Sequence, residues 1–431
     1  MTVMTMTERQ AEDGLFLWLL RRRQVGAPNV RLINLSRSDE LLDAHLDALH
    51  VAGSGSADEA GNWLETREVG AIFVAASLGL LLSDAALFHR ALAPVTAVDT
   101  AETGQSADPA NVAFAEVLAA LVRADRTAAR PAIQQLARAT EAGHQALAIA
   151  AIGARRSDPH NDLDSGKLSA DSWLMRARAC RTAGQLGRHD LMAQLRAGLT
   201  DPDPECRFWS AWAASRMGAG EEALGVLAEI AWTNQPRAVR ALDLLLRRLE
   251  LPHANAWLRE FAKLPGRQRD LIRATGVVGD PVYVPWLIER MAVPETARLA
   301  GEAFSMITGL DLAYRDLDRK PPEDFVSGPN DDPADENVAL DEDENLPWPN
   351  PERIGSWWLA NLAHYRPGTA YFLGAPKPAA DWLEALSDAF QRQRHAAALE
   401  LAIRMPQAAM FEVRARGRLQ RQLIARARGV A

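Results

Sequence analysis

The stretch "DPDPECRFWSAWAASRMG", from Asp201 to Gly218, decides the fold of this chain. It combines a proline-containing turn, a helix rich in small and aromatic side chains, and a terminal glycine. The same order recurs about every thirty residues, a period that is typical of repeat architectures. The arginines and glycines that mark the copies are Arg176, Arg207, Arg237, Arg267 or Arg269, Arg298, Gly187, Gly218, Gly279 and Gly309.

Each copy predicts a pair of helices. Leu191, Leu195 and Leu199 lie one helical turn apart and therefore share a face of the first helix. The turn 201–204 ends that helix, because a residue before proline is driven out of the α region. Small residues in the second helix allow close approach of a neighbour, and Gly218 supplies a left-handed C-cap. We therefore predict an all-α solenoid in which each pair stacks on the next.

The arginine near the start of each second helix is expected to bond the acidic turn of a neighbouring copy. Arg207 and Arg298 are interpreted as structural residues for this reason. The two cysteines, Cys180 and Cys206, both fall inside predicted repeat helices and are expected to be buried apolar residues.

The composition limits the class of protein. The chain has 431 residues, 48% of them hydrophobic, and a net charge of −8, which argues against a dedicated nucleic-acid binder. The N-terminal sequence lacks a basic segment followed by an apolar one, so no secretory signal is expected. The longest uncharged apolar run, 69–83, is shorter than the ~20 residues that a bilayer crossing requires. We expect a cytoplasmic protein without a membrane-inserted segment.

The pattern divides the chain into four segments. Residues 1–155 form a helical N-terminal domain with weak repeats, and residues 156–312 form the regular array. Residues 313–350 are expected to be a flexible linker, since 318–345 carries eleven acidic residues and only two basic ones. Residues 351–431 form a small helical C-terminal domain.

Three local expectations follow within these segments. In the N-terminal domain, Ser36 and Asp39 are interpreted as the capping box of a helix, and 52–61 as a flexible turn. In the C-terminal domain, Trp382 to Arg404 is predicted to be one amphipathic helix. The positive charge after residue 391 suggests that the acidic linker masks the arginine-rich end until a partner displaces it.

The chain resembles a family of proteobacterial HEAT-repeat proteins of uncharacterised biochemistry. The resemblance lies in "FLWLLRRR" (16–23), "GDPVYVPWLIERMAVPETARLAGEAFSMITGLDL" (279–312), and "LPWPNPERIGSWW" with "QRQRHAAALELAIRMP" near the C-terminus. It implies a HEAT-like α-solenoid and frequent genetic association with type VI secretion spike and effector genes. It implies no catalytic residues. The repeats here are shorter than the ~40 residues of standard HEAT units.

No nucleotide-binding, hydrolase, metalloprotease or CxxC motif is present in the sequence. The acids of "SDPHNDLDSG" (157–166) alternate as in a calcium loop but lack its glycine and terminal glutamate, so a solvated connector is the preferred interpretation. The histidines are scattered without metal-ligand spacing. We expect no cofactor, no metal and no enzymatic activity.

The preferred hypothesis is a protein-binding scaffold, adaptor or chaperone-like protein whose partner is a type VI secretion effector or a spike or tip protein. Solenoids bind through their repeat surface, and Trp and Arg dominate interface hot spots. The simpler interpretation of the tryptophans is core packing, and that of the C-terminal arginines is a solvated helix face. The candidate protein-binding residues are Trp209, Trp212, Arg237, Arg240, Trp286, Arg414, Arg416, Arg418 and Arg421. The alternatives are an immunity protein for a cognate toxin and, third, a HEAT-like enzyme acting on a ligand or nucleic acid.

Overall fold

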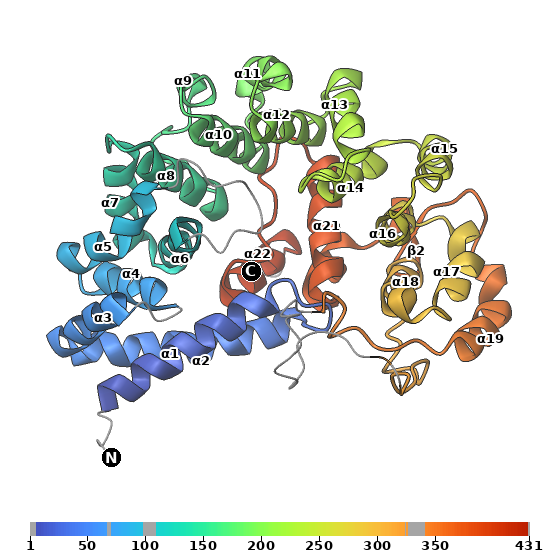
Figure 1. Ribbon diagram of the computed structural model, residues 1–431, viewed down its shortest axis with the longest axis horizontal. Coiled ribbons are helices and arrows are strands. Elements are labelled where there is room, and N and C mark those ends of the chain that lie inside the picture. The colour runs from blue at the N-terminus through green and yellow to red at the C-terminus, as the bar shows by residue number, and fades with distance from the viewer. Residues whose placement is uncertain (1–5, 67–69, 98–108, 324, 326–340, 430–431) are drawn as a thin grey trace. The chain divides into compact units, whose positions relative to one another are not determined.

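The computed structural model describes residues 6–66, 70–97, 109–323, 325 and 341–429. These residues form α-helices, six short 3₁₀ turns and one two-stranded antiparallel hairpin, as predicted for an all-α solenoid (Figure 1). The helices group into two compact units, one formed by Met1–Ile230, Asn234–Arg237 and Leu383–Ala431, the other by Ala231–Thr233 and Ala238–Trp382.

The first unit contains most of the N-terminal helices and the end of the chain. Its helices are α1 (Met6–Gln24), α2 (Leu32–Ala52), α3 (Ser54–Thr66), α4 (Ala71–Leu81), α5 (Ala85–Leu92), α6 (Pro109–Arg123), α7 (Arg126–Ala137), α8 (Ala142–Arg155), α9 (Ser165–Leu168), α10 (Trp173–Leu186), α11 (Met192–Ala197), α12 (Pro204–Arg216), most of α13 (Glu221–Ala231), most of α20 (Trp382–Asp388), α21 (Gln391–Arg404) and α22 (Gly417–Ala427).

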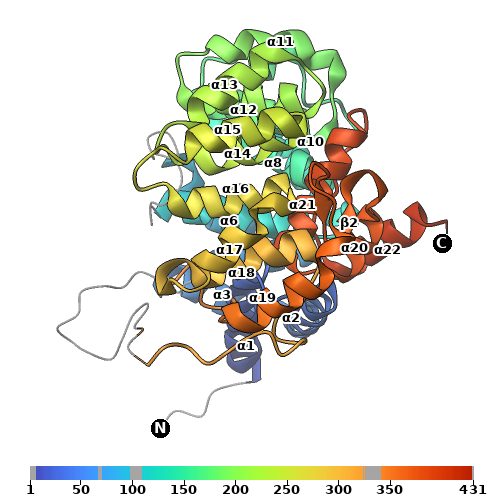
Figure 2. The same cartoon turned by 90° about the vertical axis from the view of Figure 1, so that its right-hand side faces the viewer.

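The second unit contains the later repeats. Its elements are α14 (Ala238–Arg248), α15 (Leu251–Phe261), α16 (Gln268–Val278), α17 (Val284–Arg290), α18 (Pro294–Thr308), α19 (Pro351–Asn361), β1 (Tyr371–Phe372) and β2 (Ala375–Pro376). Figure 2 shows α16, α17, α18 and α19 stacked against one another. Side chains of these four helices, together with Tyr365 and Tyr371, form one apolar core.

Small residues set the spacing of the repeats in the first unit. Helix α10 packs between α8 and α12 (Figure 1). A Cβ on Gly184 of α10 would lie 2.7 Å from the Cβ of Ala213 in α12. A Cβ on Gly153 of α8 would lie 2.6 Å from the hydroxyl of Thr182. The close approach that the small residues predicted is therefore present on both sides of α10.

The predicted turn chemistry is also present. The Asp203 carboxylate caps α12 by accepting the backbone N–H of Cys206 at 2.9 Å. Gly187, Gly279 and Gly309 are left-handed C-caps, with φ of 71°, 77° and 75°. Each of the three helices therefore ends at the residue that the repeat pattern indicated.

The repeat arginines bond the turns, in more than one way. Arg176 donates to both carboxylate oxygens of Asp201, the acidic turn of the next copy, at 2.7 and 2.9 Å. Arg207 instead donates to the backbone carbonyls of its own turn, including that of Asp201 at 2.6 Å. Arg298 binds Asp341, beyond the array, at 2.5 Å. Arg207 and Arg298 thus make structural contacts, but with their own turn and with the acidic segment rather than with the acidic turn of a neighbouring copy.

Two N-terminal expectations are wrong. Ser36 and Asp39 do not cap a helix, because α2 begins at Leu32 and both residues are buried inside it. The Asp39 carboxylate accepts Arg21 Nε at 2.9 Å and pairs with Arg123. The expected flexible turn at 52–61 is mostly helix α3, and the break is the single residue Gly53. Local capping is present elsewhere in this region, since Asn34 accepts the N–H of Arg31 at the start of α2 and Ser56 bonds the carbonyls of Leu49 and Gly53.

The C-terminal segment is not a separate domain. Residues up to Trp382 belong to the second unit, and Leu383 to Ala431 belong to the first. The expected single helix from Trp382 to Arg404 is two helices, α20 and α21. After this break the carbonyl of Val30 accepts the backbone N–H of Gln391 at 2.7 Å, which joins the start of α21 to the segment between α1 and α2.

The described end of the acidic linker is also bound rather than loose. Asp343 pairs with Arg269 at 2.9 Å, and Glu342 pairs with Arg273 at 2.7 Å. The backbone carbonyl of Asp343 accepts a bond from Arg298. These acids therefore bind arginines of the array, and the masking of the arginine-rich end by the linker stays a prediction. Residues 326–340 lie outside the described residues.

Candidate functional site

A cluster of arginines surrounds Trp209 on the repeat helices of the first unit. Helix α12 places Glu205 one turn before Trp209, so the indole Nε1–H donates to the Glu205 carboxylate at 3.2 Å. Arg237 donates to both oxygens of the same carboxylate, each at 2.8 Å. The Trp209 ring is 5% exposed, so the tryptophan and the glutamate form the buried floor of the cluster.

Helix α10 supplies two further cations to this cluster. Arg178 and Arg181 lie one turn apart on α10, and the Arg181 guanidinium carbon sits 4.6 Å from the centroid of the Trp209 ring. The guanidinium carbon of Arg237 is 5.4 Å from the same centroid. Trp209 is therefore in cation–π contact with cations from two different repeats.

The cluster has more positive than negative charge. Arg178 stacks over Phe114 with its guanidinium carbon 4.6 Å from the ring centroid. Burial, together with the nearby charge of Arg237, lowers the pKa of Arg178 to about 10, so the side chain remains protonated at neutral pH. The Glu205 carboxylate is shared by Trp209 and Arg237. Chemically, the arrangement suits an acidic or aromatic group of a partner rather than a proton transfer.

Trp212 is buried beside Trp209, and both rings pack inside the repeat array. The two rings meet edge to face with centroids 5.5 Å apart. Trp212 is 8% exposed and contacts the position of Gly184 on α10. Core packing between repeats, the simpler interpretation of the tryptophans, describes Trp212.

Residues 167–247 match the family model of HEAT repeats. The match includes α10, which carries Arg181, and α12, which carries Trp209. It also includes Arg237, which precedes α14. No curated protein and no solved structure matches the chain. HEAT repeats are in general protein-interaction scaffolds, so the candidate site lies on a class of repeat that binds proteins.

Two predicted site residues lie in the second unit. Arg240 is exposed on α14. Trp286 is half-buried on α17 beside the core of that unit, with the Arg290 guanidinium carbon 6.0 Å from its ring. The first unit thus brings together Trp209, Trp212 and Arg237, the predicted site residues of its array.

The predicted tail arginines bind mainly to carboxylates of their own unit. Arg414 donates to Glu412 at 3.0 Å. Arg416 pairs with Asp43 at 2.9 Å. The pairing of Arg421 is with Glu40, at 3.0 Å. Arg418 is exposed on α22. Arg416 and Arg421 therefore help to hold the C-terminal segment against α2, whereas the Arg414 pair lies within that segment.

Sequence reasoning missed a set of buried arginines that fasten this C-terminal segment. Arg216, at the end of α12, donates to the carbonyl of Pro406, and Arg156, after α8, donates to that of Met410 at 2.5 Å. Arg21 of α1 donates to the carbonyl of Ala415 at 3.1 Å. In the sequence these residues appear as arginines at or near the end of a helix. Such arginines are usually interpreted as cations that interact with the helix C-terminus, and not as contacts to a distant segment.

Within the described ranges, no group of histidine, cysteine, aspartate or glutamate side chains is arranged to hold a metal ion. None of the helices described combines the length and apolar character needed to cross a membrane. Cys180 and Cys206 are buried, and burial raises the pKa of Cys180 to about 11. That thiol is therefore protonated at neutral pH.

Proposed function

We propose that this chain is a non-enzymatic, cytoplasmic scaffold or adaptor that holds a protein client, a type VI secretion effector or a spike component. The observation that carries the proposal is the pair of arginines, Arg181 and Arg237, in cation–π contact with Trp209, with Arg178 close to Arg237, in a segment that matches HEAT repeats. Solenoids bind partners through such repeat surfaces, and interface hot spots favour Trp and Arg. The secretion client comes from the sequence resemblance described above.

The chemistry of the cluster supports an acidic client segment. Arg181 and Arg178 are half-buried on α10, so each is partly desolvated before a partner arrives. A partly desolvated guanidinium forms stronger hydrogen bonds to a carboxylate than a fully hydrated one does. An aspartate or glutamate of the client would face these two cations.

The experiment is a co-purification of the tagged full chain from its native host, with the wild type, Arg181→Glu and Arg196→Glu compared. Arg196 is an exposed arginine on α11, outside the cluster, so it makes the same charge change on a neighbouring helix. We expect secretion components with the wild type and Arg196→Glu, and at least a tenfold loss with Arg181→Glu. Recovery of no secretion component contradicts the assignment of the client. Equal recovery by all three proteins contradicts the assignment of the surface.

A toxin-protection assay separates the adaptor from an immunity protein. An adaptor promotes delivery of its effector and gives the producing cell no resistance to it. Resistance without any effect on delivery would overturn the adaptor proposal in favour of immunity.

A further inference from the structure

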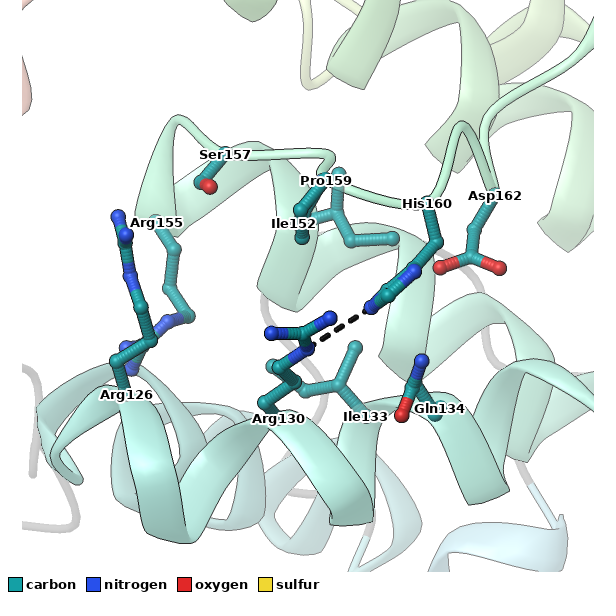
Figure 3. Close-up of a pocket in the computed structure, with 10 residues that line it drawn as sticks. All are labelled: Arg126, Arg130, Ile133, Gln134, Ile152, Arg155, Ser157, Pro159, His160 and Asp162. Atoms are coloured by element: carbon teal, nitrogen blue, oxygen red, sulfur yellow. Dashed lines mark hydrogen bonds between the residues drawn. The ribbon is translucent and has the colours of Figure 1, made fainter.

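A small basic pocket lies in the first unit between α7, α8 and the connector after α8. Its volume is about 80 Å³. Figure 3 shows the two isoleucines of its floor and the polar side chains around it. The lining residues are Arg126, Arg130, Ile133, Gln134, Ile152, Arg155, Ser157, Pro159, His160 and Asp162.

The connector, 157–162, is ordered by the carboxylate of its own Asp158. The Asp158 carboxylate accepts the backbone N–H groups of Asp162 and Leu163 at 2.8 and 3.1 Å and also binds Arg188. Of the acids that alternate as in a calcium loop, Asp158 is thus used in the turn, and Asp164 caps α9. Among the connector residues that line the pocket, His160 bonds one of the pocket arginines, Arg130.

The three arginines of the pocket are held in different ways. Arg155 is fixed, since its Nη1 donates to the carbonyls of Leu121 and Ala124, both at 2.8 Å. Arg130 is oriented by its Nε–H, which donates to His160 Nε2 at 2.9 Å. Arg126 is exposed at the first residue of α7. In Figure 3, Arg126 and Arg155 lie on one side of the pocket, and Arg130 with His160 on the other.

Positive charge in the pocket is not balanced by its lining. Among the described residues, no ion pair involves Arg126 or Arg130, and the one lining carboxylate, Asp162, lies beyond His160 in Figure 3. Burial and the charge of Arg126 lower the pKa of Arg155. The negative charge of Asp125, next to the pocket, raises the pKa of Arg155 and so partly offsets this effect. The Asp125 carboxylate also lies 3.7 Å from the guanidinium of Arg416. An anion bound between the arginines would relieve their mutual repulsion.

We propose that this pocket binds a phosphate-type oxyanion through Arg126 and Arg130, with Arg155 as a fixed positive charge beside them. Guanidinium groups match the geometry of phosphate oxygens with paired hydrogen bonds. Arg130 already donates its Nε–H to His160, which leaves its terminal N–H groups for the ligand. The volume suits a phosphoryl group and excludes a whole nucleotide. The anion is either free phosphate or a phosphoryl group carried by a serine side chain.

The test is isothermal titration calorimetry of the full chain with inorganic phosphate and, separately, with phosphoserine. Both titrations are made at constant ionic strength in chloride buffer. We expect saturable binding of at least one of them. Arg130→Gln and Arg126→Gln each weaken it about tenfold, the contribution of one charge-assisted hydrogen bond. Both arginines are exposed, so these variants keep the fold, which circular dichroism checks.

The matched control is Arg138→Gln, which removes the same charge from the exposed C-cap of α7, outside the pocket. It leaves the affinity unchanged if the pocket is the site. A tighter complex with phosphoserine than with phosphate identifies the phosphorylated side chain as the source, and the reverse identifies the free ion. No saturable binding of either anion, or an equal loss in Arg138→Gln, overturns the proposal. The titration uses no protein client, so its outcome is independent of the scaffold function.

Discussion

The guanidinium of Arg216 donates to the backbone carbonyl of Pro406 at 3.0 Å, which joins α12 to a segment 190 residues later in the chain. Arg216 has no solvent-exposed surface, and burial together with the charge of Arg156 lowers its pKa to about 10. A buried cation without a carboxylate partner is costly unless carbonyls solvate it. The C-terminal segment supplies those carbonyls, so α12 and this segment stabilise one another.

Replacement of Arg216 by methionine is expected to lower the free energy of unfolding by about 2–4 kcal/mol. The carbonyls of Pro406 and Ala408 lose their donor, and methionine leaves part of the volume empty. Urea denaturation followed by circular dichroism measures the change. The same substitution at the exposed Arg196 is expected to change the free energy by less than about 0.5 kcal/mol. Similar values for the two variants would contradict the role of Arg216.

Gly184→Ala is expected to destabilise the repeat array by about 1–3 kcal/mol, because the new methyl group would meet Ala213 at 2.7 Å. Gly225→Ala is the matched control on α13, where a Cβ meets no atom within 4 Å. It is expected to stabilise by about 0.5–1 kcal/mol through its better helix propensity. Thermal melts of both variants measure the difference. Equal shifts in melting temperature would contradict the close packing of α10 on α12.

The Arg176–Asp201 pair links adjacent repeats and is expected to show a coupling energy of about 1–2 kcal/mol. Its two charge-assisted hydrogen bonds are partly shielded from water, with the side chains 16% and 10% exposed. Asp201 is partly buried, which alone would raise its pKa, but Arg176 and the N–H of Asp203 outweigh this and lower it. A double-mutant cycle with Arg176→Gln and Asp201→Asn measures the coupling. If the two single substitutions change the free energy of unfolding additively, the pair does not help to hold the repeats together.

Stability is expected to fall as the pH drops from about 6.5 to about 4, with His395 as one cause. Burial of this residue on α21, with the charge of Arg414, lowers its pKa to about 4. The unfolded chain, with a histidine pKa of about 6.5, binds the proton first, so this part of the stability is lost over that window. The expected loss is up to roughly 2 kcal/mol, less than full burial would give because the ring is partly exposed.

Urea titrations at several pH values test this expectation. His395→Gln is expected to show a shallower decrease in the free energy of unfolding than the wild type. His50→Gln, at an exposed histidine of α2, is the control and keeps the wild-type slope. A slope unchanged by His395→Gln would show that the acid sensitivity has another source.

Local spacing along the chain was enough to predict the helical pairs of the array, its glycine C-caps and its period. Leu195, Asp203 and Gly187 act through neighbours within a few residues, so local spacing predicted the elements that they begin, fill or end. The pairing of Arg176 with Asp201 of the next copy follows the repeat spacing, whereas Arg207 and Arg298 bind other partners.

Tertiary structure alone decided where distant segments dock. Arg216 meets Pro406, and Asp39 accepts the N–H of Gly417 at 2.8 Å, because folding brings together residues far apart in the sequence. The sequence does not show whether an arginine is buried or exposed, so it gave no reason to treat the buried Arg216 differently from the exposed Arg196. The basic pocket likewise exists only once α7, α8 and the connector are packed, since no local pattern places Arg126 beside Arg155. Local spacing specifies elements, whereas burial and charge balance depend on which elements meet.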